Sequence, residues 1–595
     1  MSRRALLRGS ACVVTAAAFS AIPNVASSIS ETGKEIVQEF PFGAVQLTGG
    51  LLKQQLDRIH SHYLALSNDR LLKVFRQRVG LPAPGADMGG WYDTNGFVPG
   101  LTLGQYISGL ARLGAATGDQ SCHNKVRALV AGFGEFLSRT ENPYAGQGAE
   151  KMWAAYVMDK YVVGLVDAYR LSGIEQAKKL LPEVIAKCRP FISPVSKDRI
   201  GKKDPPYDET YVLSENLFAA AAITNDKKYY DLAVHYLLDR EWFDPLAAGE
   251  NVLPTKHAYS HTIALSSGGQ AYLSTGNIKY KKALENAWRF MEAQRFASGG
   301  WGPEEQFVEP GKGKLFESLS NSSAHFETPC GAYADLKLAR YLIRLTGDSR
   351  YGDGLERTLY NTMLATRTPD SDGGYPYYSS YGANAVKKYY HRKWPCCSGT
   401  LVQGVADYVL NIYFHDDEAL YVNLYTPSTV SWKRQSGTVV VEQTTNYPSE
   451  DTSRITIRSG GKFALKVRIP AWANDATIRV NGRAAIAAKA GQYAVMDRHW
   501  KNGEMVDVVI PQTLRTLPID ESHSNIVALM RGAVMYVGLN PWEGLTETRV
   551  NLPAALKQMN GRKDSYVLSV SEQNLVFVPY FDVQLESYNT YFKVG

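Results

Sequence analysis

The chain has 595 residues and a formal charge of +7 at neutral pH, and three of its cationic side chains, Arg3, Arg4 and Arg8, lie within the first ten residues. A chain of this length exceeds what one hydrophobic core holds, so we expect two or three domains. The remaining charge is small and no Lys/Arg cluster marks a nucleic-acid-binding surface, so we expect no nucleic acid partner.

Residues 1–28 have the features of a twin-arginine export signal. Arg3 and Arg4 precede a weakly apolar run, 11–22, and a stretch of small residues, 25–28. The apolar run is too short to span a bilayer and no later run is long enough, so we expect no membrane insertion. We expect the mature protein in the periplasm or outside the cell.

A repeated helical hairpin organises the chain from about residue 100 to 350. Each unit pairs two apolar helices through a short turn of Thr-Gly-Asp character. The Gly or Asn suits the left-handed residue that ends one helix, and the Thr, Ser or Asp favours the start of the next. The turns recur at a spacing typical of stacked helical hairpins. They stand at 116–119, 171–173, 223–226, 274–277 and 345–348.

Helical hairpins bury a face only against their neighbours, so the array forms either an open solenoid or a closed ring. The helices are rich in Tyr, Ala and Gly, as in 156–161 and 271–273. This composition favours the closed ring, with a polar and aromatic pocket at its centre.

One interval of the repeat is longer than the others, and the surplus is the Gly-rich loop 298–310, which contains Trp301, Glu304, Glu305 and Glu309. Insertions in a hairpin array map to loops on one face, where function tends to sit. Hydrolysis of a glycosidic bond needs a proton donor and a nucleophile, usually two carboxylates. The same cluster also fits a solvated surface loop.

After residue 415 the apolar pattern changes from helical to alternating. Short segments bounded by Gly, Pro, Asn and Asp predict β-strands. They include 419–425, 437–441, 464–469, 477–482 and 505–510. We therefore expect an all-β sandwich, jelly-roll-like, which packs on the ring as a structural partner or binds sugar.

Two short segments hold three of the six cysteines. One contains Glu327 and Cys330, and the other contains the adjacent pair Cys396 and Cys397. Three thiolates and a carboxylate form a donor set that can hold zinc, and a thiolate of depressed pKa is a good nucleophile near neutral pH. The alternatives are a disulfide between two of these thiols and a plain core position for Cys330.

Taken in order along the chain, these motifs resemble glycoside hydrolase family 127. The resemblance rests on 299–300, 305–307, 327–330, 396–397, 466–472 and 480–482. Retaining β-L-arabinofuranosidases with an (α/α)6 barrel followed by β-sandwich domains typify that family. The resemblance therefore implies an α+β multidomain fold, with the catalytic barrel over 29–415 and the C-terminal β-sandwich over 416–595.

The resemblance also implies a role for each motif residue. Zinc would be held by Glu327, Cys330, Cys396 and Cys397. Cys396 would be the nucleophile that forms a thioglycosyl-enzyme. Glu305 would be the general acid for the leaving group and then the base that activates water.

Four further residues are expected to bind substrate. A pocket histidine of the family falls on His261. A pocket tyrosine falls on Tyr378, and Tyr377 fits that position almost as well. Trp301 belongs to the insertion loop beside the expected acid.

The chain departs from the family pattern at three places. Pro329 is inserted between Thr328 and the following cysteine, which leaves the ligation by Glu327 open. Residues 398–400 replace a Pro-rich continuation, and other pocket histidines fall near Lys160 and Tyr211. The sugar and its linkage therefore stay open.

Two classes of function remain. The first is a retaining exo-glycoside hydrolase, β-L-arabinofuranosidase-like, that uses Zn²⁺ and acts on an oligosaccharide or glycan. The second is a non-catalytic carbohydrate-binding or scaffold protein with a structural zinc or a disulfide. An intermediate alternative is a hydrolase that uses two carboxylates, such as Glu305 and Glu309. The choice between a monomer and a homodimer stays open.

Overall fold

The computed structural model describes residues 33–145, 153–199, 209–366, 375–570 and 572–595, so the predicted export signal, 1–28, lies outside the described residues. The helical part is a closed double ring, in which each inner helix contacts the next and α15 contacts α3. This closure confirms the expected (α/α)6 barrel. The inner helices are α3 (Leu103–Thr117), α5 (Ala154–Ser172), α7 (Ser214–Thr224), α10 (Ala258–Thr275), α13 (Thr328–Thr346) and α15 (Cys396–Ala406).

An outer helix packs against each inner one. In the same order the outer helices are α4 (Gln120–Leu137), α6 (Glu175–Cys188), α8 (Lys227–His235), α11 (Ile278–Glu292), α14 (Arg350–Thr358) and α1 (Gly50–Ala65). Shorter helices, α2 (Asn68–Arg78), α9 (Asp244–Ala248) and α12 (Lys314–Asn321), lie in the connections.

The predicted turns connect each inner helix to its outer partner. The residue that ends the inner helix is left-handed in all five, namely Gly118, Gly173, Asn225, Gly276 and Gly347. In three turns the side chain of the next residue, namely Asp119, Asp226 or Asn277, caps the outer helix by accepting a hydrogen bond from a backbone N–H of its first turn. The left-handed residue and the capping side chain therefore fix where an inner helix ends and where its outer partner begins, as the sequence predicts.

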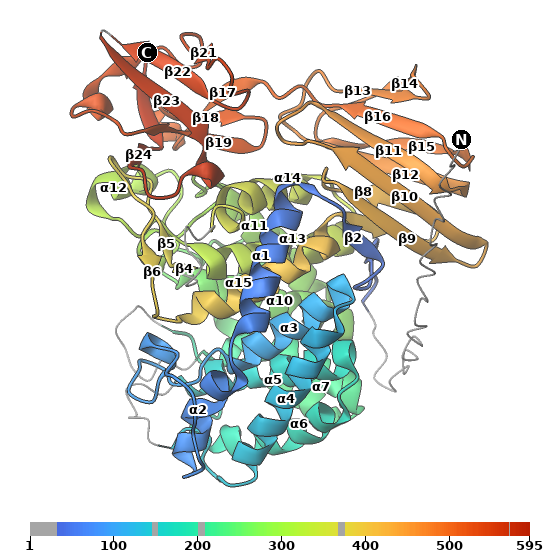
Figure 1. The fold of residues 1–595 in the computed structure, drawn as a ribbon, viewed down its shortest axis with the longest axis vertical. Helices are drawn as coiled ribbons and strands as arrows, with labels where there is room; N and C mark the ends of the chain where they lie inside the picture. Colours follow the sequence, from blue (N-terminus) through green and yellow to red (C-terminus); the bar gives the residue numbers. More distant parts are fainter. Residues whose placement is uncertain (1–32, 146–152, 200–208, 367–374, 571) are drawn as a thin grey trace, which may run out of the picture.

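Two β-rich units follow the helices, and Figure 1 shows both above the ring. The first contains a five-stranded sheet, in the order β1-β7-β8-β12-β15, and a seven-stranded sheet, β14-β13-β16-β11-β10-β9-β2. Their strands are β1 (Gln38–Glu39), β2 (Val45–Leu47), β7 (Tyr413–His415), β8 (Ala419–Val422), β9 (Ser428–Arg434), β10 (Gly437–Thr445), β11 (Thr452–Ser459), β12 (Gly461–Ile469), β13 (Thr477–Val480), β14 (Arg483–Ala487), β15 (Gln492–Trp500) and β16 (Met505–Val509).

The second unit is a nine-stranded sheet with the path β20-β25-β18-β19-β23-β22-β21, in which β17 pairs with β18 and β24 pairs with β19. Its strands are β17 (Leu514–Pro518), β18 (Ile526–Arg531), β19 (Val534–Leu539), β20 (Arg549–Val550), β21 (Lys557–Gln558), β22 (Tyr566–Val570), β23 (Gln573–Pro579), β24 (Tyr588–Asn589) and β25 (Tyr591–Val594).

The first β unit is tied to the helical ring at two places. Strands β1 and β2, which come before the first helix, pair antiparallel with β7 and β9. On β12, the fully buried Arg468 guanidinium lies 3.1 Å from Glu356 of α14. Removing one partner from a buried ion pair costs free energy, so this contact resists separation of the first β unit from the helical ring.

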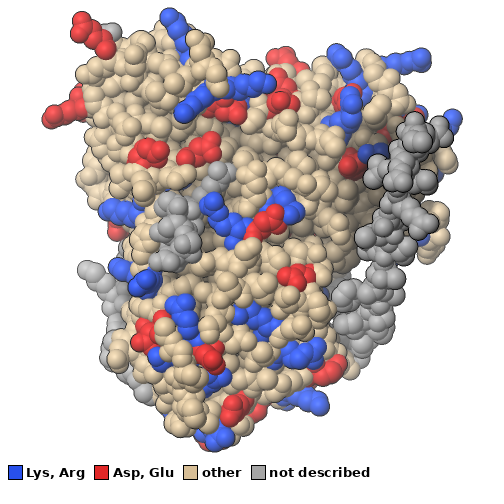
Figure 2. Space-filling model, viewed as in Figure 1, with Lys and Arg blue, Asp and Glu red and all other residues tan. Residues whose placement is uncertain are grey.

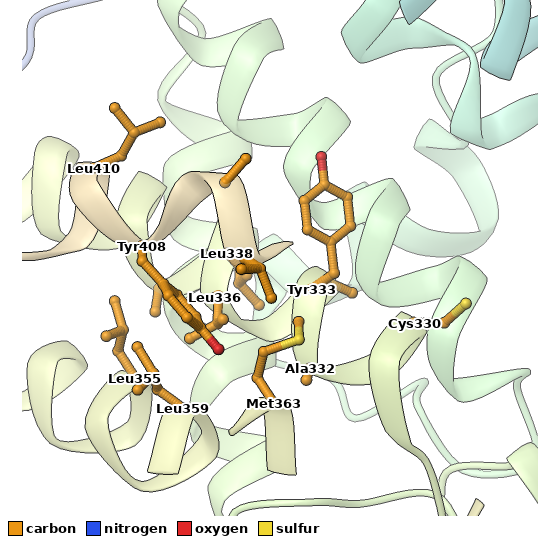
Figure 3. Packing of buried hydrophobic residues seen from close by; sticks show 14 of the residues in the cluster. Cys330, Ala332, Tyr333, Leu336, Leu338, Leu355, Leu359, Met363, Tyr408 and Leu410 are labelled. Atoms are coloured by element: carbon orange, nitrogen blue, oxygen red, sulfur yellow. The ribbon is translucent and has the colours of Figure 1, made fainter. Parts of the chain in front are cut away.

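The core behind α13 holds that helix in place. In Figure 3, Leu336 and Leu338 of α13 pack near Leu355 of α14 and near Met363 and Tyr408 in the following segments. Cys330 lies apart from this apolar group, nearer the start of the same helix. Close packing of this kind fixes the axis of α13 and so fixes the position of its first turn.

The surface carries both signs of charge. On the face in Figure 2, Lys and Arg side chains alternate with Asp and Glu over all parts of the molecule. Among the described helices, none combines the length and the apolar character needed to cross a membrane.

Candidate active site

The four expected metal ligands lie at the N-termini of two neighbouring inner helices. Glu327 ends strand β3 (Phe326–Glu327) and immediately precedes α13, whose first turn contains Cys330. Cys396 and Cys397 are the first two residues of α15. Because α13 packs against α15 in the ring, one atom from each of the four side chains lies within 4.8 Å of the others.

The inserted Pro329 does not remove Glu327 from this group. Pro329 lies in the first turn of α13, where its missing N–H has no intrahelical partner to lose. Strand β3 pairs with β5 (Tyr378–Ser379), and Glu327 lies opposite Tyr378. The strand pairing therefore holds Glu327 beside the helix start, and its Oε1 lies 3.5 Å from the Cys396 sulfur.

The thiols are free, which contradicts the disulfide alternative. The sulfurs of Cys330 and Cys397 are 3.4 Å apart, far beyond the S–S bond length of about 2.05 Å. Cys397 also lies 3.8 Å from Glu327 Oε1, and the Thr400 hydroxyl lies 3.2 Å from the Cys330 sulfur.

Protons are distributed unequally over the four groups. Hydrogen bonds from the Cys330 and Cys397 thiols hold the pKa of Cys396 well below its ordinary value. Burial raises the pKa of Glu327, Cys330 and Cys397 well above their ordinary values. The thiolate therefore belongs to Cys396, and the start of α15 adds backbone N–H groups and a favourable helix dipole.

The donor set fits a zinc ion. Zinc takes three sulfurs and one oxygen in a tetrahedral arrangement, and Zn–S bonds of about 2.3 Å place two sulfurs about 3.8 Å apart. The 3.4 Å between Cys330 and Cys397 needs only a small outward movement to reach that spacing. Burial raises the pKa of Glu327, Cys330 and Cys397 because it disfavours several adjacent negative charges, a cost that a bound cation would offset.

A pocket of about 410 Å³ opens over this cluster. Cys396 lines it and is 8% exposed, whereas Cys330 and Cys397 are fully buried. The remaining lining residues are Trp91, Phe97, Val98, Leu101, Trp153, Tyr156, Arg199, Glu209, His257, Tyr259, Glu305, Glu327, Tyr377, Tyr378 and Tyr390. Among the described cysteines, Cys396 is thus the one that can meet a bound ligand.

Glu305 reaches the same pocket from the insertion loop. Glu304 and Glu305 both have positive φ angles, 55° and 62°, a conformation that costs a non-glycine residue free energy. The Tyr378 hydroxyl donates a hydrogen bond to Glu305 Oε1. The His257 Nε2 lies 3.5 Å from Glu305 Oε2. The loop therefore aims this carboxylate at the pocket that Cys396 lines.

The other two glutamates of the loop point elsewhere. Glu304 is exposed and accepts a hydrogen bond from the Ser322 hydroxyl. Glu309 is also exposed and does not line the pocket. The carboxylates that share the pocket with Cys396 are Glu209, Glu305 and Glu327.

The two expected tyrosines both line the pocket. Tyr378 bonds Glu305, and the Tyr377 hydroxyl lies 3.7 Å from the Cys396 sulfur. They come from consecutive positions beside β3, so one contacts the candidate acid and the other the candidate nucleophile.

His261 and Trp301 do not line the pocket. His261 is fully buried, its ring bonding Asp198 at 2.8 Å and the His257 carbonyl at 2.9 Å. Trp301 is 1% exposed and packs on Phe326, with ring centres 5.0 Å apart. The pocket histidine is His257, one helical turn before His261.

His257 is held as a neutral donor. Burial lowers its pKa, and its Nδ1 accepts a hydrogen bond from the Ser260 backbone N–H. The remaining proton of the neutral ring therefore lies on Nε2, which faces Glu305.

The remaining described cysteines lie outside the pocket. The Cys122 sulfur is 3.3 Å from His60 Nε2, which pairs with Asp119 at 2.9 Å. Cys188 is buried on α6. Both are buried, and neither is among the lining residues.

Comparisons with known proteins agree on one family. The sequence family described as "Beta-L-arabinofuranosidase, GH127 catalytic domain" matches residues 44–409, and the one described as "Beta-L-arabinofuranosidase, GH127 middle domain" matches residues 419–512. A search of curated proteins finds no match.

Two solved structures have the same fold over nearly the whole chain. A GH127 β-arabinofuranosidase is 18% identical, with a TM-score of 0.73, covering 94% of this chain and 98% of its own. A GH127 β-L-arabinofuranosidase from Geobacillus stearothermophilus T6 is 18% identical, with a TM-score of 0.70, covering 93% and 100% respectively.

In the metal-free protein, Cys396 should react with iodoacetamide at a lower pH than Cys330 or Cys397, because its thiol has the lowered pKa and is the one exposed to the pocket. Peptide mapping by mass spectrometry after timed alkylation measures this. Tyr377→Phe removes a hydrogen bond that favours the Cys396 thiolate. In this variant the alkylation of Cys396 should therefore begin at a higher pH. An unshifted profile, or first modification at Cys397, contradicts the assignment.

Proposed function

Because the chain belongs to glycoside hydrolase family 127, we propose that it is a retaining, exo-acting hydrolase of β-L-arabinofuranosidase type, with Cys396 as the nucleophile and Glu305 as the general acid and base. The observation that carries this proposal is the shared pocket. The Cys396 thiol, whose pKa is lowered, and the Glu305 carboxylate, held by Tyr378, line the same cavity.

The first step forms a covalent enzyme intermediate. The Cys396 thiolate attacks the anomeric carbon and forms a C–S bond, while the bond to the leaving oxygen breaks. Glu305 gives its proton to that oxygen, so the leaving group departs as a neutral alcohol. Tyr377 stabilises the thiolate before attack through its hydrogen bond to the Cys396 sulfur.

The second step releases the sugar. Glu305, now a carboxylate, takes a proton from water, and the oxygen of that water attacks the anomeric carbon. The C–S bond breaks, and Cys396 leaves as a thiolate. Each step inverts the carbon once, so the product retains the configuration of the substrate. His257 and Tyr378 keep the Glu305 carboxylate oriented through both steps.

Glu327, Cys330, Cys396 and Cys397 would hold a zinc ion in this function. A bound zinc supplies positive charge that keeps the buried sulfurs and the carboxylate ionised together. Within the chain itself, Glu327 and Cys397 position the sulfur of Cys396, since both lie beside it at the start of α15.

The size of the pocket favours attack on a chain end. A cavity of about 410 Å³ suits one or two sugar units, which is the requirement of an exo-acting enzyme. Aromatic rings line its mouth, among them Trp91, Phe97 and Tyr390, and such rings offer apolar faces to the C–H surfaces of a sugar.

Glu305→Gln should lower kcat on an aryl β-L-arabinofuranoside by about 100- to 10,000-fold, since it removes the acid and base. Added azide should restore part of the turnover and give a glycosyl azide of retained configuration, because azide attacks the covalent intermediate without a base. The control variants Glu304→Gln and Glu309→Gln change exposed carboxylates of the same loop and should keep wild-type rates. Loss of activity in Glu309→Gln instead favours the two-carboxylate hydrolase.

Purified protein should contain about one zinc per chain, as four protein ligands require. Cys330→Ser should lower the zinc content and the melting temperature together. Cys188→Ser changes a buried thiol outside the site and should keep the full zinc content. Elemental analysis beside thermal unfolding measures both, and an equal zinc content in all three proteins contradicts the proposed ligand set.

A further inference from the structure

One carboxylate of the pocket has no part in the chemistry above. Glu209 lines the pocket and is 1% exposed. Glu209 directly precedes the short helical turn Thr210–Val212. This turn packs on α5 and α10 of the inner ring. Its position is therefore set by the barrel.

Arg199 fixes this carboxylate in the charged state. The Arg199 Nη1 donates to Glu209 Oε1 at 2.5 Å, and the guanidinium stacks 5.0 Å over the ring of Trp153, another lining residue. Burial raises the pKa of Glu209, but the ion pair outweighs burial and leaves that pKa below its ordinary value. A buried charge retained in a binding pocket has a cost that binding of a ligand can offset.

The hydrogen-bonding capacity of Glu209 is only partly used. Among the described residues its carboxylate has one hydrogen-bond partner, Arg199, on Oε1. An ionised carboxylate offers about four acceptor positions. The remaining oxygen, on a side chain that lines the cavity, is thus able to accept hydrogen bonds from a ligand.

A second lining group complements it. The Tyr156 hydroxyl is buried and has no hydrogen-bond partner in the described part of the chain. A sugar hydroxyl can donate to a carboxylate and accept from a phenol at the same time. The Glu209 carboxylate, as acceptor, and the Tyr156 hydroxyl, as donor, can therefore both form hydrogen bonds with the hydroxyl groups of a sugar.

We propose that Glu209, braced by Arg199, is the residue that selects the terminal sugar, by accepting hydrogen bonds from two hydroxyl groups of a neutral glycosyl unit. This inference rests on the proposed function for the identity of the reacting bond. It also excludes uronic acids from the terminal position, because three carboxylates, Glu209, Glu305 and Glu327, share the pocket with one arginine.

The test measures sugar binding separately from catalysis. Methyl β-L-arabinofuranoside and its 2-deoxy and 3-deoxy analogues are titrated against the protein, with tryptophan fluorescence as the readout, since Trp91 and Trp153 line the pocket. Glu209→Gln should weaken binding of the full sugar about 10- to 100-fold, the range expected for loss of charge-assisted hydrogen bonds. The same substitution should weaken binding of at least one deoxy analogue by a clearly smaller factor than binding of the full sugar, because one of the two bonded hydroxyls is already absent.

A matched variant separates recognition from stability. Glu215 on α7 pairs with Lys337, is 12% exposed and does not line the pocket. Glu215→Gln should lower the melting temperature as Glu209→Gln does, yet leave sugar affinity unchanged. Equal weakening of all three sugars by Glu209→Gln overturns the inference, and so does unchanged affinity.

Failure of the inference about Glu209 can be distinguished from failure of the proposed function. If the wild type binds the sugar but does not hydrolyse its aryl glycoside, the proposed activity is wrong while the binding comparison still decides the role of Glu209. If the wild type binds none of a panel of neutral methyl glycosides, the inference about Glu209 is wrong. Tighter binding of a methyl uronide than of the neutral glycosides overturns it as well.

Discussion

The site depends on one electrostatic constraint, the crowding of a carboxylate and three thiols in a buried volume at the meeting of two helix N-termini. Burial raises the pKa of Glu327, Cys330 and Cys397, whereas hydrogen bonds from the neighbouring thiols lower the pKa of Cys396, so ionisation is easiest at that sulfur. The charge settles on Cys396, which is also the sulfur that faces the pocket. One arrangement thus produces both a metal-binding donor set and an activated nucleophile.

Ring closure provides that arrangement. Glu327 and Cys330 are separated from Cys396 by more than sixty residues of chain, and they meet because α13 and α15 are adjacent inner helices. The strained insertion loop then brings Glu305 to the same cavity, with Tyr378 connecting the loop to strand β3. The first β unit contributes indirectly, since it anchors the outer helix α14 through Arg468.

Much of this was predictable from local sequence signals. The Gly and Asn residues of the turns determine helix ends through their own backbone preferences, so the hairpins and the ring followed from the sequence. The roles expected for Glu305 and Cys396 followed from the resemblance to glycoside hydrolase family 127, because residue type alone left several glutamates and cysteines open. Tyr377 and Tyr378 were likewise expected from that resemblance.

The remaining features depend on long-range geometry. His261 was expected in the pocket, but His257 occupies it. The difference of one helical turn depends on the position of α10 along its own axis in the ring, which sequence does not encode locally. The pairing of β1 and β2 with strands nearly four hundred residues later is equally non-local. Arg199 and Glu209 gave no signal, because an Arg–Glu pair in a loop is most often solvated surface.

The most direct test of the central claim is to trap the intermediate. Glu305→Gln protein, mixed with an aryl β-L-arabinofuranoside that has a good leaving group, should accumulate the covalent enzyme, since the first step no longer needs an acid and the second still needs a base. Intact and peptide mass spectrometry should find one pentosyl unit on the peptide that contains Cys396. A pentosyl unit on Glu327, or burst release of the aryl group with no adduct on any cysteine, contradicts the account.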